Sequence, residues 1–307
     1  PPTTPPPPTE NYTQVNSSAA SDVYKRQGFL HPGAMGISLA ASALNSGHVA
    51  YWVSQGRSPD TYQRAKKYNL LETGTVEELC QVCSVIISVC PPHAAAEVAG
   101  QVLACSFKGI YADVNAISPQ RAEQIERRMT GTGMDFVDGG LIGGPAWKPG
   151  STFLYLSGRA AGQVAACFAG GPLETEIIGD EIGKASALKM CYAANTKGTT
   201  ALLCAVVAAA EQMGVRNELE KQWSLDDPDF TVQTLDRIRR VTTKAWRFSG
   251  EMEEIASTFE VAGLPDGFHL AASEIYQRIT KFKGADPLPI VGDVLDALLH
   301  PDEVEGI

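Results

Sequence analysis

Residues 28–58 constrain the fold of this chain more than any other segment, because their pattern predicts a strand, a turn, a helix and a second strand. A short apolar run enters a turn that contains Gly33 and Gly36, and the small residues over 38–43 follow as a helix. The apolar run 49–53 then forms the next strand. This order of elements is half of a dinucleotide-binding unit.

The predicted turn offers what a diphosphate needs from a protein. Glycine allows the backbone to approach closely, and the N–H groups and dipole at the start of the helix attract negative charge. A complete G-x-G-x-x-G motif would have glycine where this chain has His31, so the motif is partial. The residues predicted to contact a cofactor here are Gly33, Ala34, Met35 and Gly36.

Strands and helices continue to alternate as far as about residue 182. The predicted strands are 85–89, 110–114, 135–138, 151–157 and 174–178, and the predicted helices are 60–68, 94–103 and 119–129. This alternation predicts an α/β Rossmann domain with a doubly wound parallel sheet over residues 28–182. Ligands are expected at the carboxyl ends of its strands.

The remaining residues, 183–307, predict a second, all-α domain. Residues 185–213 have a helical pattern that is apolar on nearly every face, and a helix of this kind is expected to be buried. The longest uncharged run within it, 198–210, is too short to cross a bilayer.

Residues 1–27 are rich in Pro, Thr and Ser and have no hydrophobic periodicity, so a disordered tail is expected. They also lack the apolar core of a signal peptide. Tyr24-Lys25-Arg26-Gln27 stands where a Rossmann domain has a buried apolar strand, and the string SDVYKRQ resembles translated sequencing adapter. We therefore expect the tail to be an artefact and the native first strand to be missing.

Charge and cysteine usage restrict the kind of partner. A formal net charge of -10 argues against a nucleic-acid backbone or an anionic membrane, and a small-molecule partner fits better. The seven cysteines are scattered, mostly in apolar contexts, which predicts reduced thiols in the cytoplasm. Cys80 and Cys83 form a C-x-x-C without a second pair or a nearby His, so no metal site is predicted.

The end of the second strand indicates the cofactor type, because an acidic residue there binds the ribose hydroxyl of NAD and an arginine favours the 2′-phosphate of NADP. The segment between 49–53 and Ser58 contains no Asp or Glu, while Arg57 supplies a guanidinium and Ser58 a hydroxyl. NADP(H) is predicted, and the alternative is an ordinary polar loop. Pro91 and Asn115, each close behind a predicted strand, complete the predicted cofactor-binding set.

Lys189 lies in a helix so apolar that its ammonium must find a partner, have a lowered pKa or face a site. The last option suits a catalyst, because the ammonium could donate a proton to a carbonyl oxygen as hydride arrives from a nicotinamide. Tyr192 shares this helix face and is predicted to contact substrate. The alternative is a lysine that reaches solvent from the helix end, and that alternative is favoured for Lys197.

A glycine-rich segment follows the predicted strand 135–138. Asp138, Gly143 and Gly144 are predicted to bind substrate, since a glycine loop can present backbone N–H groups to a carboxylate. A tight crossover that needs glycine for steric reasons explains the pattern equally well.

Over residues 28 to about 200 these features resemble the β-hydroxyacid dehydrogenase and 6-phosphogluconate dehydrogenase superfamily. The run 244–265 resembles a subgroup of it with its own helical C-terminal domain. The resemblance implies a catalytic role for Lys189, an NAD(P) cofactor, and a homodimer formed through the helical domain. The family asparagine and substrate-loop serine fall on Ala193 and Ile142, which puts the usual hydroxyacid substrate in question. The matching segments are Pro32-Gly33-Ala34-Met35-Gly36, Arg57-Ser58, Pro91-Pro92, 138–144, and Gly183 with Lys189.

The predicted function is therefore that of an NADP(H)-dependent oxidoreductase that interconverts a small hydroxy acid or alcohol and its carbonyl form. Two alternatives stay open. Imine reductases share the fold, although they usually have another residue at the position of Lys189. A non-catalytic NADP-binding sensor would fit the partial turn and the apolar residues Ala193 and Ile142.

Overall fold

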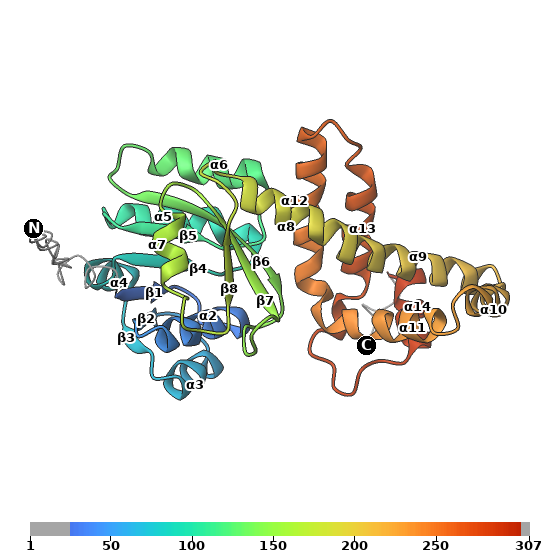
Figure 1. The fold of residues 1–307 in the computed structure, drawn as a ribbon. Helices are drawn as coiled ribbons and strands as arrows, with labels where there is room; N and C mark the ends of the chain where they lie inside the picture. The colour runs from blue at the N-terminus through green and yellow to red at the C-terminus, as the bar shows by residue number, and fades with distance from the viewer. Residues whose placement is uncertain (1–24, 302–307) are drawn as a thin grey trace, which may run out of the picture.

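The computed structural model describes residues 25–301, which form a sheet-containing part and a helical part joined side by side (Figure 1). The sheet has eight strands in the order β3-β2-β1-β4-β5-β6-β7-β8. Neighbouring strands pair in parallel except β6 and β7, which are antiparallel. The strands are β1 (Arg26–Phe29), β2 (Val49–Val53), β3 (Leu71–Thr73), β4 (Val85–Ser88), β5 (Ile110–Asp113), β6 (Asp135–Gly143), β7 (Thr152–Ser157) and β8 (Glu174–Ile177).

The strand order confirms the predicted doubly wound Rossmann domain. From β1 the chain runs to β2 and β3 on one side, and it resumes with β4 on the other side. The strand order therefore reverses between β1 and β4, and in sheets of this kind the crevice at the carboxyl ends of such a pair is where ligands bind.

Helices cover both faces of this sheet, as expected for strands that are apolar on both sides. One core lies between the sheet and α2 (Ala34–Asn45), α3 (Pro59–Lys67) and α7 (Ala161–Ala166). A second core lies between the opposite face and α4 (Val76–Val82), α5 (Ala95–Ala104) and α6 (Pro119–Met129). The helices predicted over 60–68, 94–103 and 119–129 are confirmed to within one residue at each end.

The prediction of disorder was wrong for residues 26 and 27. Residues 26–29 form β1, which pairs with β2 on one side and with β4 on the other. The polar Gln27 is fully buried in it, and its amide nitrogen lies 2.9 Å from Nδ1 of His48 and 3.5 Å from Sγ of Cys167. Two ladders of backbone hydrogen bonds thus hold a sequence with little apolar character. The rest of the predicted tail, residues 1–24, lies outside the described residues.

The helical part confirms the predicted all-α region. Its long first helix is α8 (Lys184–Ala193), which continues through a π-helical segment, η2 (Ala194–Gly198), into α9 (Thr199–Gln212). Its core joins α8 and α9 to the later helices. These are α10 (Arg216–Asp226), α11 (Phe230–Val241), α12 (Ala245–Val261), α13 (Gly267–Arg278) and α14 (Val291–Leu299), with 3₁₀ turns η3 (Thr242–Lys244) and η4 (Thr280–Phe282).

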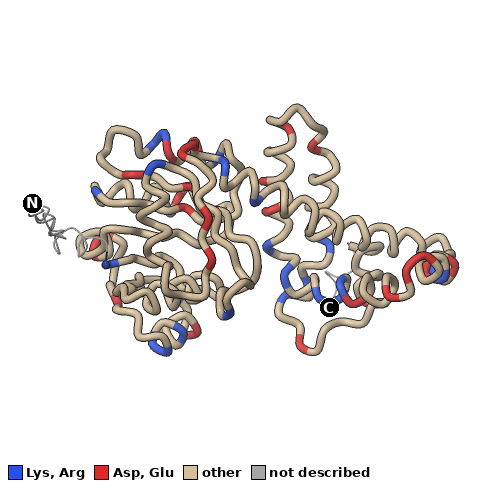
Figure 2. The backbone as a smooth tube through the Cα atoms, in the orientation of Figure 1, with Lys and Arg blue, Asp and Glu red and all other residues tan. Residues whose placement is uncertain are grey.

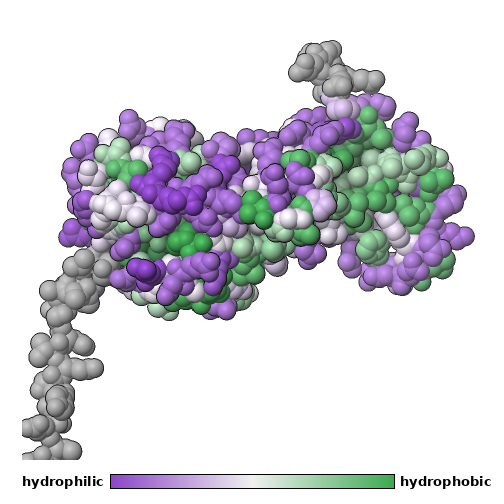
Figure 3. Space-filling model, turned by 90° about the horizontal axis from the view of Figure 1, so that it is seen from above, coloured by the Kyte–Doolittle hydropathy of each residue, from purple (hydrophilic) through white to green (hydrophobic). Residues whose placement is uncertain are grey.

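The expectation that this long helix is buried on nearly every face was wrong. Leu188, Tyr192 and Leu202 are 36%, 47% and 47% exposed. Figure 3 shows apolar surface gathered over the helical part of the molecule. No helix within residues 25–301 combines the length and the apolar character that a membrane span requires.

Candidate active site

The turn between β1 and α2 is tight. Gly33 precedes the first residue of α2, and a Cβ added at Gly36 would lie 2.1 Å from the carbonyl oxygen of His31. Arg64 supports the turn from α3, because its Nε donates a hydrogen bond to the carbonyl oxygen of Pro32. Ala34 and Met35 begin the helix, and the first turn of α2 contains no acidic residue that would repel a phosphate.

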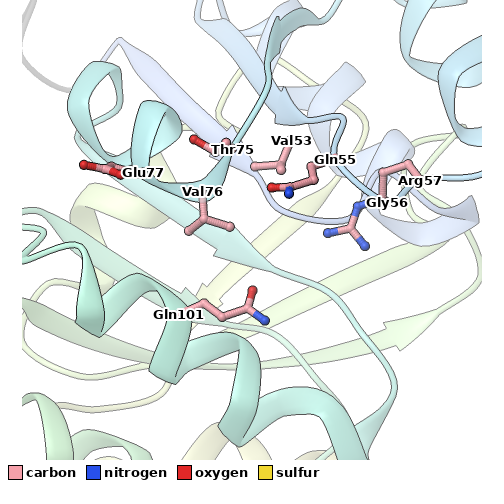
Figure 4. Close-up of a pocket in the computed structure, with 8 residues that line it drawn as sticks. All are labelled: Val53, Gln55, Gly56, Arg57, Thr75, Val76, Glu77 and Gln101. Carbon is pink, nitrogen blue, oxygen red and sulfur yellow. The ribbon is translucent and has the colours of Figure 1, made fainter.

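A cavity of about 470 Å³ opens at the carboxyl end of β2, where the adenosine half of a dinucleotide lies in this fold. Figure 4 shows the Arg57 guanidinium pointing into it. The Nε of Arg57 is buried without a hydrogen-bond partner, and burial lowers the pKa of this guanidinium. An anion would supply the missing acceptor. The lining residues are Val53, Gln55, Gly56, Arg57, Thr75, Val76, Glu77 and Gln101.

Ser58 acts at the start of α3. Its hydroxyl accepts a hydrogen bond from the backbone N–H of Thr61, as a helix N-cap does. The positive end of a helix dipole therefore lies directly beside Arg57, which strengthens the attraction for an anion at this point.

His31, which stands where a complete motif has glycine, shares this environment. Burial, together with the smaller effect of the Arg57 charge, lowers its pKa to about 4. Its Nδ1 is buried without a partner. The imidazole is consequently neutral at pH 7, with one ring nitrogen available to a group bound in the turn.

Asn115, predicted to contact the cofactor, has its side chain committed to the protein. It is 2% exposed, its Oδ1 accepts the backbone N–H of Cys90, and its Nδ2 donates to Oγ of Ser88 at 3.1 Å. Its role in the structure is to join the carboxyl ends of β4 and β5. Pro91 follows on that edge and is exposed.

The carboxylate of Asp138, predicted to bind substrate, is instead hydrogen-bonded within the protein, and this prediction is corrected. The carboxylate is fully buried and accepts hydrogen bonds from the backbone N–H groups of Gly183 and Ser186, at 3.0 Å each. The hydroxyls of Ser186 and Ser157 donate to it at 2.6 and 3.1 Å. Burial raises its pKa while these bonds oppose the rise. Asp138 thus fixes the start of α8 against β6.

The glycine-rich segment is strand rather than the predicted loop as far as Gly143, and substrate binding by Gly143 and Gly144 stays a prediction. β6 continues to Gly143, where φ is +117° and a Cβ would lie 2.3 Å from a backbone oxygen of Ser151. A Cβ at Gly140 would lie 2.5 Å from the carbonyl oxygen of Ala185 and 3.1 Å from Cβ of Lys189. The glycines therefore let α8 and β7 pack closely on β6. Gly144 follows the strand and accepts a hydrogen bond from Thr152.

Lys189 consequently lies with its Cβ directly over Gly140 of β6. Among residues 25–301 the structure shows no hydrogen bond or ion pair for its ammonium. Burial lowers the pKa of Lys189 to about 8, and the nearby charge of Arg247 contributes. An amine in this state can both donate and accept a proton near neutral pH. Tyr192, one turn later, is exposed.

The side chain of Lys197 is largely buried, contrary to the favoured expectation that it reaches solvent. Its ammonium pairs with the carboxylate of Glu251 on α12 and lies 4.4 Å from the ring centre of Phe248. Sequence reasoning missed these α12 residues, because nothing in the local pattern shows which face of α12 meets α8. In the described part of the chain, no group of three or more His, Cys, Asp or Glu side chains is placed to hold a metal ion.

Segments in both parts of the chain match known family models. Residues 27–166 match the NAD binding domain of 6-phosphogluconate dehydrogenase, and residues 210–279 match a domain of unknown function, DUF1932. An uncharacterized 28.5 kDa protein of Methanothermus fervidus is 32% identical over 165 residues, which are 54% of this chain. The match spans 63% of that relative's length.

Solved structures share the architecture. A conserved protein of unknown function, described as structurally similar to 3-hydroxyacid dehydrogenases, is 27% identical with a TM-score of 0.61, over 83% of this chain and 97% of that chain. The 3-hydroxyisobutyrate dehydrogenase of Mycobacterium tuberculosis is 17% identical with a TM-score of 0.63, over 89% and 99%. A reductive aminase of Aspergillus terreus, solved with NADPH, is 17% identical with a TM-score of 0.53, over 89% and 99%. At 17% identity the likeness is one of fold.

Proposed function

We propose that this protein is an NADP(H)-dependent oxidoreductase, and the match of residues 27–166 to the NAD binding domain of 6-phosphogluconate dehydrogenase supports the proposal. It interconverts a small hydroxy acid or alcohol and the corresponding carbonyl compound. The observation that carries this proposal is Lys189, an unpaired amine with a pKa of about 8 held against β6.

The chain's own residues divide the work. NADPH, when bound, supplies the hydride that the carbonyl carbon receives. Lys189 in its ammonium form donates a proton to the carbonyl oxygen during reduction, and as a neutral amine it accepts the hydroxyl proton during oxidation. Asp138 acts as a positioning residue, since it fixes the turn of α8 from which Lys189 projects. The α2 start and the Gly36 turn hold the diphosphate.

Lys189→Ala tests the catalytic assignment. Loss of general acid–base catalysis lowers kcat by roughly 100- to 10,000-fold, while NADPH binding measured by fluorescence stays near the wild-type value. Lys184→Ala is the matched control, because Lys184 lies on the same helix in an exposed pair with Glu181. Wild-type kcat in Lys189→Ala would remove this residue from the mechanism.

Arg57→Ala tests the choice of NADPH. The exposed 2′-phosphate loses a charge-assisted hydrogen bond, so the preference for NADPH over NADH should fall by about 10- to 100-fold. Arg127→Ala on α6, which removes an exposed pair with Glu123, is the control. An unchanged preference in Arg57→Ala contradicts the NADP assignment.

A panel of hydroxy acids, ketones and cyclic imines, followed by NADPH absorbance, tests the substrate class. Turnover of hydroxy acids or ketones supports the proposal. Turnover of imines alone would favour an imine reductase, and tight NADPH binding without any turnover would favour a sensor. The apolar Ala193 and Ile142 are the features that give these alternatives weight.

We further propose a homodimer in which α8 and α9 of two copies pack together. Leu188, Tyr192 and Leu202 are large side chains left exposed on these helices, and such patches mark interaction sites. Light scattering should give twice the monomer mass, and Leu202→Glu should give the monomer. The cytoplasmic location stays a prediction; all seven cysteines are free, as it requires.

A further inference from the structure

One face of α12 carries three charged residues, Arg247, Glu251 and Glu254, at intervals of three or four residues. Lys244, the last residue of η3, comes immediately before α12 and three residues before Arg247. Both carboxylates have partners: Glu251 pairs with Lys197, and Glu254 pairs with Arg121 at 2.7 Å. Within residues 25–301 the structure shows no carboxylate paired with the two basic residues.

This face lies along the carboxyl edge of the sheet. Glu254 also accepts the backbone N–H of Ser118 at 2.8 Å, just beyond the end of β5, and α12 packs against η1 (Pro92–Ala94) beyond β4. Arg247 is two helical turns before Glu254, about 10 Å along the axis. Figure 2 shows basic residues gathered on the side of the helical part that faces the sheet.

Arg247 is close to Lys189 and Lys197 at this edge. The guanidinium carbon of Arg247 lies 5.3 Å from the ring centre of Phe248, and the ammonium of Lys197 lies 4.4 Å from the centre of the same ring. The charge of Arg247 contributes to the lowered pKa of Lys189. Lys244 and Arg247 both act on Lys197 in the same direction.

Charge in this cluster is unbalanced. Lys189, Lys244 and Arg247 each act on the charge of Lys197. Arg247 also acts on that of Lys189, whereas Glu251 pairs with Lys197. The Nε of Arg247 is buried without a hydrogen-bond partner. A buried donor without an acceptor is costly, and a ligand that supplies an acceptor removes that cost. The imbalance therefore selects an anion.

We propose that Arg247, assisted by Lys244, binds an anionic group of the substrate, a carboxylate or a phosphate, while Lys189 exchanges a proton with the oxygen on the reacting carbon. This inference rests on the proposed function and narrows its substrate class to acids. It also gives α12, in the region of unassigned function, a specificity-determining role. Guanidinium is well suited to it, because its fork of donors matches two oxygens of a carboxylate or phosphate.

Anion binding to the whole protein tests this proposal without turnover. Inorganic phosphate and succinate are titrated separately by calorimetry, each in the presence and absence of saturating NADPH. Wild type should bind at least one of them, and Arg247→Gln should weaken that binding by about tenfold or more. Arg247→Lys, which keeps the charge but loses the fork, should fall between the two. The ratio of phosphate to succinate affinity identifies which anion the site takes.

Arg240→Gln is the matched control, because Arg240 on α11 is 72% exposed and pairs with Asp236. It should bind both anions as wild type does. Circular dichroism should show that Arg247→Gln keeps the wild-type fold, because the Nε of Arg247 makes no hydrogen bond within the protein. Equal binding by wild type and Arg247→Gln, or no binding of either anion by wild type, overturns the proposal.

Loss of anion binding when NADPH is added also overturns it, since the cluster would then hold a phosphate of the cofactor. Because these titrations need no reaction, their outcome is separate from that of the Lys189→Ala assay. Anion binding that depends on Arg247 in a protein without turnover would refute the proposed function alone.

Discussion

Lys189 should give the enzyme a distinctive pH dependence. Burial and the charge of Arg247 lower its pKa from 10.5 to about 8. At pH 7.5 about a quarter of a group with a pKa of 8 is neutral amine, compared with about 0.1% of a group with a pKa of 10.5. The protein environment therefore increases the fraction of competent base by about 200-fold at this pH.

The measurement is kcat/KM against pH in both directions, because kcat/KM reports the pKa of the free enzyme. Oxidation needs the neutral amine, so log kcat/KM should rise with a slope of about one and level off above pH 8. Reduction needs the ammonium, so its kcat/KM should fall as the pH rises through 8. Arg247→Gln removes the smaller of the two causes, so both inflections should move to higher pH but remain below 10.5.

A second readout avoids the substrate. Trace labelling with acetic anhydride, quantified by mass spectrometry, follows the reactivity of Lys189 against pH, with exposed Lys184 as the internal reference. Opposite pH trends of the two directions, centred near 8 and shared by the labelling curve, support the reasoning. An identical trend in both directions, or inflections that Arg247→Gln leaves in place, would refute it.

Three further predictions concern stability, measured by urea unfolding. Asp138→Asn leaves buried N–H donors of α8 without full acceptors, so the unfolding free energy should fall by about 2–4 kcal/mol; a loss below 0.5 kcal/mol contradicts the assigned contacts. Gly36→Ala should destabilise strongly because of the 2.1 Å contact with His31, whereas Gly33→Ala, with no atom within 4 Å, should not. Burial raises the pKa of Asp113 from 3.8 to about 7, so its stability contribution is full below pH 4 and is lost as the pH rises through 7. The loss between pH 5 and 8 should be about 3 kcal/mol and absent in Asp113→Asn; equal pH curves would show that Asp113 is not the cause.

The hydrophobic periodicity of the sequence correctly predicted those parts of the fold that depend on local sequence. The alternation of strands and helices predicted the doubly wound sheet, and Gly36 indicated a turn that tolerates no side chain. The same reasoning failed at residues 26–29, because a strand held by neighbours on both sides needs less apolar character of its own. The polarity of a segment does not show whether it will pair with a neighbouring strand on one side or on both.

The candidate site was predictable in part. A charged residue in an apolar helix drew attention to Lys189, and the missing acid after β2 drew attention to Arg57; the structure gives each an unpaired, partly buried cation. Asp138 and Asn115 were placed at the right edge of the sheet. Their hydrogen bonds to Ser186 and Cys90, 48 and 25 residues away, could not be seen in the sequence.

The sequence by itself thus determined the architecture, the sheet edge where a cofactor is expected, and Lys189 as the candidate catalytic residue. Each of these follows from short-range periodicity or from one residue whose polarity differs from that of its neighbours. Only the tertiary structure decided which polar groups are satisfied within the protein and which are left for a ligand. Asp138 and Glu254 find donors across the fold, whereas within residues 25–301 the Nε of Arg247 and the ammonium of Lys189 find no acceptor. That difference depends on which helix faces meet, and it follows from packing between distant segments rather than from the residues themselves.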